Sequence, residues 1–159
     1  MKTAWKMPPI IKVYEALGAI GDGRVAIVDR TTARVTSSDG AKVYDVISSE
    51  DGREISSNDN ASYWQGYLGY PAIATLVMRE LLKMPPGVAE MLAGIPWKTI
   101  NRRFGNDYEK TLGEVDRQLR TAGHQPQQIR LAAEAVLEEL GEFAPLKGKR
   151  TRPARGNAG

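Results

Sequence analysis

Residues 24–56 read RVAIVDRTTARVTSSDGAKVYDVISSEDGREIS. In this stretch β-branched and other apolar residues tend to recur at every second position, and Asp-Gly pairs, which favour tight hairpin turns, stand at 39–40 and 51–52. The pattern predicts four short strands, at Arg24–Asp29, Ala33–Ser37, Lys42–Ile47 and Arg53–Ser56. Because the loops between them are too short for the crossovers of a parallel sheet, we expect an antiparallel β-meander with one face covered by helices.

Helices are predicted on both sides of this meander. Pro8-Pro9 introduces an apolar stripe with helical spacing, so we expect an amphipathic helix over Ile10–Ala19. After the meander, Pro71 begins a second helix that runs to Leu82. These two helices would pack against the sheet and form the core with it.

The pattern after residue 83 is helical throughout. Prolines and glycines divide it into two short helices and two longer ones, at Val88–Ala93, Pro96–Phe104, 106–122 and from Pro126 onward. The longer pair is joined by a short connection, which favours an antiparallel helical hairpin. We therefore predict a single α+β domain over 1–144, in which 1–83 hold the meander with its helices, 84–144 form a helical subdomain, and a basic tail follows over 145–159.

Composition argues against several kinds of catalytic site. The 159 residues include no cysteine and one histidine, His124. Disulfides, thiolate metal sites and cysteine nucleophiles are thereby excluded. A single histidine also argues against histidine metal clusters and Ser-His-Asp catalysis. We therefore predict no catalytic residues, no cofactor and no metal, and favour a binding function.

Charge is divided unevenly along the chain. The tail over 145–159 carries no acidic residue and five basic ones, namely Lys147, Lys149, Arg150, Arg152 and Arg155. The other 17 basic residues and all 19 acidic ones lie in 1–144, so the body is at −2 although the whole chain is at +3. Since Leu146 is the tail's only large apolar residue, we expect a flexible arm. Such an arm would contact nucleic-acid phosphates, and a merely solubilising end is the alternative.

A local motif also points to nucleic acid. In residues 88–104, VAEMLAGIPWKTINRRF, Gly94 permits a tight turn and Ile100 would pack the second helix on the first. The outer face of that second helix would present Trp97, Lys98, Arg102 and Arg103. The segment resembles the turn and second helix of the lactose-repressor-type helix-turn-helix, which implies that this helix enters a DNA groove. It departs from that pattern at Glu90, where the motif has a small residue, and at Arg103, where it has an apolar one. A helix pair that only supports the fold is the alternative.

Another group of candidates follows the last predicted strand. A polar loop at 58–60 leads into an aromatic cluster in which Tyr63, Tyr67 and Tyr70 have helical spacing. Exposed rings would stack on single-stranded bases, whereas buried rings would fill the core, and we expect the latter. The predicted lining of a polar pocket is Asn58, Asp59, Asn60, Tyr63 and Trp64. An Asx turn that caps the next helix is the alternative for this loop.

Three functions are compatible with these patterns. The leading expectation is non-catalytic binding of DNA or RNA through the helix pair and the basic tail. One alternative is a homodimer formed by the C-terminal helices through a seam of Tyr108, Leu112, Val115 and Leu119. Another is an enzyme with its pocket at 58–60. Since no apolar run is long enough to span a bilayer and no targeting segment opens the chain, we expect a cytoplasmic protein without a membrane partner.

Overall fold

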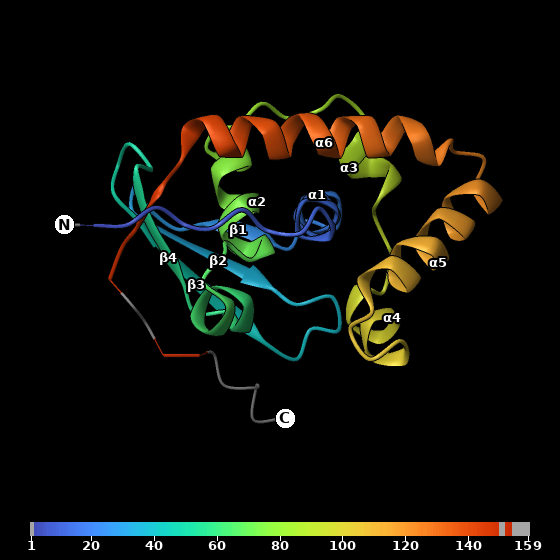
Figure 1. The fold of residues 1–159 in the computed structure, drawn as a ribbon, viewed down its shortest axis with the longest axis horizontal. Coiled ribbons are helices and arrows are strands. Elements are labelled where there is room, and N and C mark those ends of the chain that lie inside the picture. Colours follow the sequence, from blue (N-terminus) through green and yellow to red (C-terminus); the bar gives the residue numbers. More distant parts are fainter. Residues whose placement is uncertain (1, 150–151, 154–159) are drawn as a thin grey trace.

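The computed structural model describes residues 2–149 and 152–153 and contains a five-stranded sheet (Figure 1). The strands are β1 (Val25–Ile27), β2 (Thr32–Thr36), β3 (Val43–Ser48), β4 (Glu54–Ser57) and β5 (Leu146–Lys147). Strands β1 to β4 pair in chain order and antiparallel, whereas β5 joins β4 in parallel. The predicted α+β fold and its four-stranded antiparallel meander are confirmed, with strand ends displaced by no more than two residues.

Alternation along the strands assigns one face of the sheet to the core. On β2, Ala33 and Val35 are buried, while Arg34 between them reaches solvent. There it forms an ion pair with its register partner on β3, Asp45, over 3.4 Å. The apolar face packs against α2 (Tyr70–Met78), as expected of a meander covered on one side.

Helix α1 (Ile11–Gly21) lies at the centre of the molecule, with α2, α3 (Val88–Met91) and α6 (Pro126–Phe143) packed around it (Figure 1). All residues from 11 to 19 are buried, so the helix has no solvent face, although its single apolar stripe predicted one. A side chain at Gly21 would collide with the backbone of Ala89, so this glycine lets α1 and α3 approach closely.

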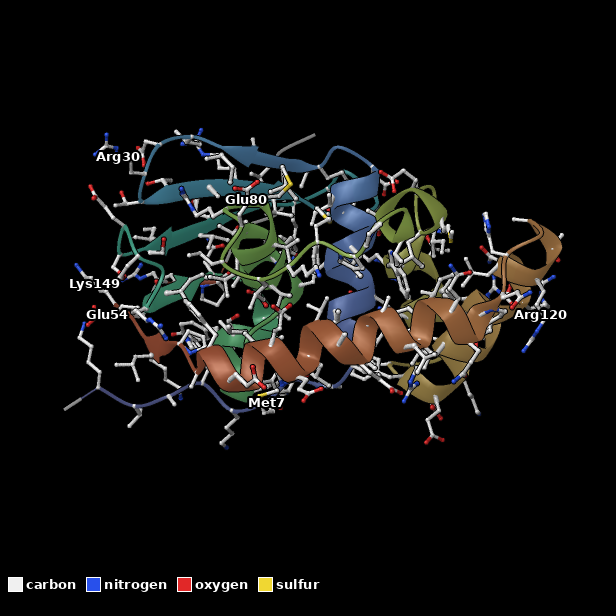
Figure 2. The ribbon with its side chains drawn as sticks, turned by 90° about the horizontal axis from the view of Figure 1, so that it is seen from above. Met7, Arg30, Glu54, Glu80, Arg120 and Lys149 are labelled. Carbon is white, nitrogen blue, oxygen red and sulfur yellow. The ribbon has the colours of Figure 1, made fainter. Side chains whose placement is uncertain are left out.

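The other helices extend the molecule beyond this core. Helix α4 (Trp97–Arg103) packs on α5 (Tyr108–Thr121), and α6 then returns across α1 to the sheet. Helices α5 and α6 form the expected hairpin, opened into a V away from their connection (Figure 1). Figure 2 shows Glu54 and Lys149 at the sheet end of the molecule and Arg120 at the opposite end.

Two helix boundaries differ from the prediction for identifiable reasons. The helix predicted to reach Leu82 ends at Met78, shortly before Glu80 takes a left-handed φ of 62°. Helix α5 is capped by Asp107, whose carboxylate accepts a hydrogen bond from the backbone N–H of Lys110 over 3.3 Å. The predicted start of this helix at residue 106 is therefore wrong. Asn106 instead has a positive φ of 64°, which asparagine tolerates better than most residues.

The seam predicted as a dimer surface packs inside the chain. Val115 and Leu119 are buried, and Tyr108 and Leu112 pack against the same core. Helix α5, which carries these side chains, packs against both α4 and α6. Val115 and Leu119 are therefore core residues, and a homodimer through the half-buried Tyr108 and Leu112 stays a prediction.

The first residues of the predicted tail belong to the sheet. The backbone N–H groups of Leu146 and Gly148 donate to the carbonyls of Arg53 and Ile55 over 2.7 and 3.1 Å. The prediction of a flexible arm is therefore wrong for residues 145–148, because backbone hydrogen bonds hold this segment without much apolar side-chain area. Residues 150–151 and 154–159 of the predicted arm lie outside the described residues. Arg152 is described and exposed.

The N-terminal residues 2–9, here called the strap, cross the other side of β5. The backbone N–H of Lys147 donates to the carbonyl of Thr3 over 2.8 Å, and that of Trp5 donates to the carbonyl of Pro145 over 3.1 Å. Strand β5 is thus held between the strap and β4. The two ends of the described chain meet at one edge of the sheet.

Candidate functional site

Two cavities share a wall, the single π-helical turn η1 (Ala61–Gln65). Asp59, Asn60 and Ala61 line the first, here called the inner cavity, of about 330 Å³. Residues 62–65 line the second, the outer groove, of about 380 Å³. The loop and aromatic cluster that the sequence indicated as one pocket are therefore divided between two cavities.

One predicted pocket residue lines neither cavity. The side-chain Oδ1 of Asn58 accepts a hydrogen bond from the backbone N–H of Asp45 over 2.8 Å. Asn58 therefore ties the end of β4 to β3, and its assignment to a pocket is wrong.

The outer groove is built where the two ends of the described chain meet. Its lining comes from the strap, β4, η1 and β5 and comprises Trp5, Lys6, Ser56, Ser57, Ser62, Tyr63, Trp64, Gln65, Gly66, Lys147 and Gly148. The indole Nε1 of Trp5 donates to the carbonyl of Ile55 over 2.9 Å, and the backbone N–H of Lys6 donates to the carbonyl of Gly66 over 3.1 Å. These bonds fix the strap to the sheet and to η1.

The charge of the outer groove is wholly basic among the described residues. Its charged side chains are Lys6 and Lys147, and neither forms an ion pair within the described chain. A methyl group at Gly66 would lie 3.6 Å from Lys147 Nζ and 3.9 Å from Lys6 Cδ, so both lysines converge on this glycine. Lys147 Nζ also lies 5.2 Å from the centre of the Trp5 ring. Two ammonium groups without a carboxylate favour an anion in the groove.

Aromatic rings and a hydroxyl complete the groove. Trp64 is 66% exposed and packs edge-on against Tyr63, with ring centres 4.5 Å apart. The expectation of a buried ring is wrong for Trp64, whose side chain lies in solvent. Gly66, at a φ of 76°, ends η1. The buried Oγ of Ser57 has no hydrogen-bond partner within the described chain.

The inner cavity lies between α1, α4, the β2–β3 turn and η1. It brings together residues that the sequence placed in two separate sites, since Lys98 and Arg102 of the helix pair face the same space as Asp59 and Asn60. The full lining is Lys12, Glu15, Arg24, Ser37, Ser38, Tyr44, Asp59, Asn60, Ala61, Tyr70, Trp97, Lys98, Asn101, Arg102 and Asn106.

A buried ion pair forms part of the inner cavity. Lys12 Nζ lies 3.2 Å from a carboxylate oxygen of Glu15, one turn away on α1. Burial opposes the charge on Lys12, but the Glu15 carboxylate together with Tyr108 and Tyr67 more than offsets this, so the pKa of Lys12 is raised. Burial likewise raises the pKa of Glu15, against the effect of the Lys12 ammonium. The pair can stay charged only because its members neutralise each other.

The other carboxylate and the phenols of the inner cavity are also held. Asp59 accepts hydrogen bonds from the backbone N–H of Ser62 over 3.1 Å and from its hydroxyl over 2.7 Å. Tyr44 and Tyr70 pack edge-on at 6.0 Å, and burial raises the pKa of Tyr44 to about 12. Both phenols therefore remain protonated donors at neutral pH.

Helix α4 presents the predicted nucleic-acid face in part. Trp97 is 2% exposed and packs edge-on against Tyr14 of α1, so the prediction that it contacts a groove of DNA is wrong. Lys98 lies 3.7 Å from Asp39, and Arg103 pairs with Glu114 over 3.9 Å. Arg102 is exposed and has no ion pair within the described chain.

Sequence reasoning missed many residues of these cavities, Asn101 and Ser57 among them. Trp5 and Lys6 gave no local signal, because the partners that place them in the outer groove come from the far end of the chain. Lys12 and Glu15 did offer one signal, since opposite charges three residues apart lie on the same side of a helix. Arg150 and Arg155, both predicted to bind nucleic acid, lie outside the described residues.

Residues 5–145 match a family model described as "Uncharacterised conserved protein UCP014422". The chain belongs to this family. The matched span begins at Trp5 and ends at Pro145, so it includes η1 and all the residues that line the inner cavity. No curated protein and no solved structure matches the chain.

Two further findings concern the described part of the chain. None of its helices is both long enough and apolar enough to cross a membrane. Residues 2–149 and 152–153 contain no group of three or more His, Asp or Glu side chains placed to hold a metal ion.

Proposed function

We propose that the protein binds single-stranded nucleic acid in the outer groove. The observation that supports this proposal is an exposed indole, Trp64, in one groove with two lysines that lack carboxylate partners. Proteins that bind single strands combine aromatic rings, on which bases stack, with a basic groove that follows the phosphates. The leading expectation from the sequence is thus retained, with its main site moved from α4 to the groove beside η1.

The chain beyond the groove offers further cations. Lys149 is exposed at the sheet end of the molecule, two residues after Lys147 (Figure 2). Arg152 is exposed as well. A nucleic-acid strand that leaves the groove past Lys149 and Arg152 would meet additional positive charge, which supports phosphate contacts outside the groove.

The form of the site favours unpaired bases over a duplex. Trp64 offers a largely exposed ring on which a base can stack, and base pairs in a duplex present their edges while their faces stay stacked. We therefore expect the protein to bind an oligothymidylate more tightly than a duplex of equal length.

Anisotropy of a labelled oligothymidylate, measured across a range of salt concentrations, tests the proposal. Stacking on one aromatic residue contributes about 1 to 3 kcal/mol per base, so Trp64→Ala should weaken binding by roughly fivefold to a hundredfold. Leu131→Ala is the matched control, because Leu131 is also a large exposed residue, at 57%, and lies on α6 outside both cavities. Unchanged affinity in Trp64→Ala, or no salt-sensitive binding by the wild type, would contradict the proposal.

The exposed Arg102 supports a second candidate, duplex binding along α4. This helix also carries Lys98 and Arg103 and has no acidic residue. The resemblance to a helix-turn-helix implies that the same helix enters a DNA groove. A duplex affinity that falls in Arg102→Ala and stays constant in Trp64→Ala would favour this second surface.

A further inference from the structure

The inner cavity contains a buried acceptor that lacks a donor. Asn101 on α4 is 9% exposed and lines the cavity, and its Oδ1 has no hydrogen-bond partner within the described chain. Buried polar atoms in native proteins are nearly always paired, so an orphaned one calls for a partner from outside the chain. A ligand with a hydrogen-bond donor would supply it.

The same cavity has a basic mouth. Arg102 is exposed and has no ion pair within the described chain, and Lys98, one helical turn earlier, has a single contact of 3.7 Å with Asp39. Residues four apart lie on one side of a helix, so these two cations are neighbours at the cavity. An arginine fork next to an ammonium suits a phosphate group.

The acidic groups of the cavity do not cancel this charge. Glu15 is paired with Lys12 over 3.2 Å, and Asp59 accepts two hydrogen bonds from Ser62. Arg102 therefore stands as the charge in the cavity that a ligand can neutralise.

The remaining walls suit a planar ring. Tyr44, Tyr70 and Trp97 line the cavity, and its volume of about 330 Å³ is within the range of small-molecule sites. An asparagine amide pairs well with the amino edge of adenine, where its oxygen accepts from the exocyclic amino group. Aromatic walls, an unpaired asparagine oxygen and a basic mouth thus occur together in one space of suitable size.

From this combination we infer that the inner cavity is a site for a nucleoside monophosphate with an amino-bearing base. The phosphate lies at Arg102 and Lys98, and the amino group of the base donates to Asn101 Oδ1. This site is separate from the outer groove and goes beyond the proposed function.

Calorimetric titration with adenosine monophosphate tests the inference. Adenosine, which lacks the phosphate, and inosine monophosphate, which has a carbonyl in place of the amino group, should each bind about tenfold more weakly. Arg102→Ala should weaken adenosine monophosphate by a similar factor. Arg103→Ala, the matched control on the same helix, should leave it unchanged, because Arg103 pairs with Glu114 and does not line the cavity. Asn101→Ala should remove the preference for adenosine over inosine monophosphate.

Three results would overturn the inference. They are the absence of adenosine monophosphate binding at millimolar concentration, binding that Arg102→Ala leaves intact, and binding that Trp64→Ala abolishes instead. The last result would place the nucleotide in the outer groove and leave the proposed function standing. Oligothymidylate separates the two sites further, because thymine has no amino group to offer Asn101. Arg102 is exposed, so its variant reports on the site even if Asn101→Ala fails to fold.

Discussion

The inner cavity and the outer groove share η1 as a wall but differ in whether their charged side chains have partners. In the inner cavity the buried carboxylates have partners, since Glu15 meets Lys12 and Asp59 is bonded to Ser62. In the outer groove Lys6 and Lys147 converge without a carboxylate. Burial explains the difference, because an unpaired charge costs far more free energy inside a protein than at its surface. The buried pairs therefore support the fold, whereas the two groove lysines, which lack carboxylate partners, are available to a ligand.

Breaking the buried pair should give the largest effect. Glu15→Ala leaves the Lys12 ammonium buried without its partner, so we expect the free energy of unfolding to fall by about 3 to 5 kcal/mol. Urea denaturation followed by circular dichroism measures this loss. The double variant Lys12→Met/Glu15→Leu removes both charges and should recover much of the stability. A loss below about 1 kcal/mol in the single variant would show that the pair does not support the fold.

Filling the space beside the inner cavity should give the next largest effect. A methyl group at Gly18 would lie 2.7 Å from Nε1 of the buried Trp97, and overpacking of this kind costs about 1 to 3 kcal/mol. Gly113→Ala is the control, since Gly113 lies in α5 with open space around it and should gain up to about 1 kcal/mol from helix propensity. Melting curves that shift in the same direction for both variants would contradict this account of Gly18.

Removing the lysines of the outer groove, the exposed Lys6 and the half-buried Lys147, should change binding and leave the fold nearly intact. Lys6→Ala and Lys147→Ala should each alter the free energy of unfolding by less than about 0.5 kcal/mol. Each should lower the slope of log affinity against log salt for oligothymidylate by about 0.7. Lys110→Ala, at an exposed lysine of α5, is the control for both measurements. A loss of stability as large as that expected for Glu15→Ala would remove the contrast between the two cavities.

The last effect is confined to high pH and concerns the phenol of Tyr44 in the inner cavity. Burial raises the pKa of Tyr44 from 10.0 to about 12, so in this window the unfolded chain loses the phenol proton first. Stability contributed by Tyr44 is therefore fully present below pH 10 and falls as the pH rises towards 12. Urea midpoints measured between about pH 9 and pH 11 should decline less in Tyr44→Phe than in the wild type. Equal declines would show that this phenol ionises as freely in the folded protein.

Local signals were sufficient for the meander and for most helices. Alternating residues and Asp-Gly turns are properties of neighbouring positions, so β1 to β4 could be predicted from the sequence. The full burial of α1 could not, because it depends on α3 and α6, which come much later in the chain. Lys12 and Glu15 have the character of a solvent face until their mutual pairing is known.

Single residues of the candidate sites could be predicted from the sequence, but their grouping into two cavities could not. Asp59 and Arg102 were both singled out, but nothing local shows that they face the same space. Trp97 looked available because its helix is short and basic, and its burial follows from contact with Tyr14. The outer groove required β5, whose pairing uses backbone atoms that every residue possesses and therefore leaves little trace in side-chain pattern.

The hydrogen bonds between the strap and β5 determine when the outer groove forms during folding. Contacts between Thr3 and Lys147 close a loop that contains nearly the whole described chain, and contacts so distant in sequence form slowly. During synthesis the meander and α2 can assemble while α6 is still absent, but the outer groove has no second wall until Gly148 has been made. A nascent chain would therefore be unable to bind through this groove before its sheet edge is closed. The ability to bind through this groove is therefore gained late in folding.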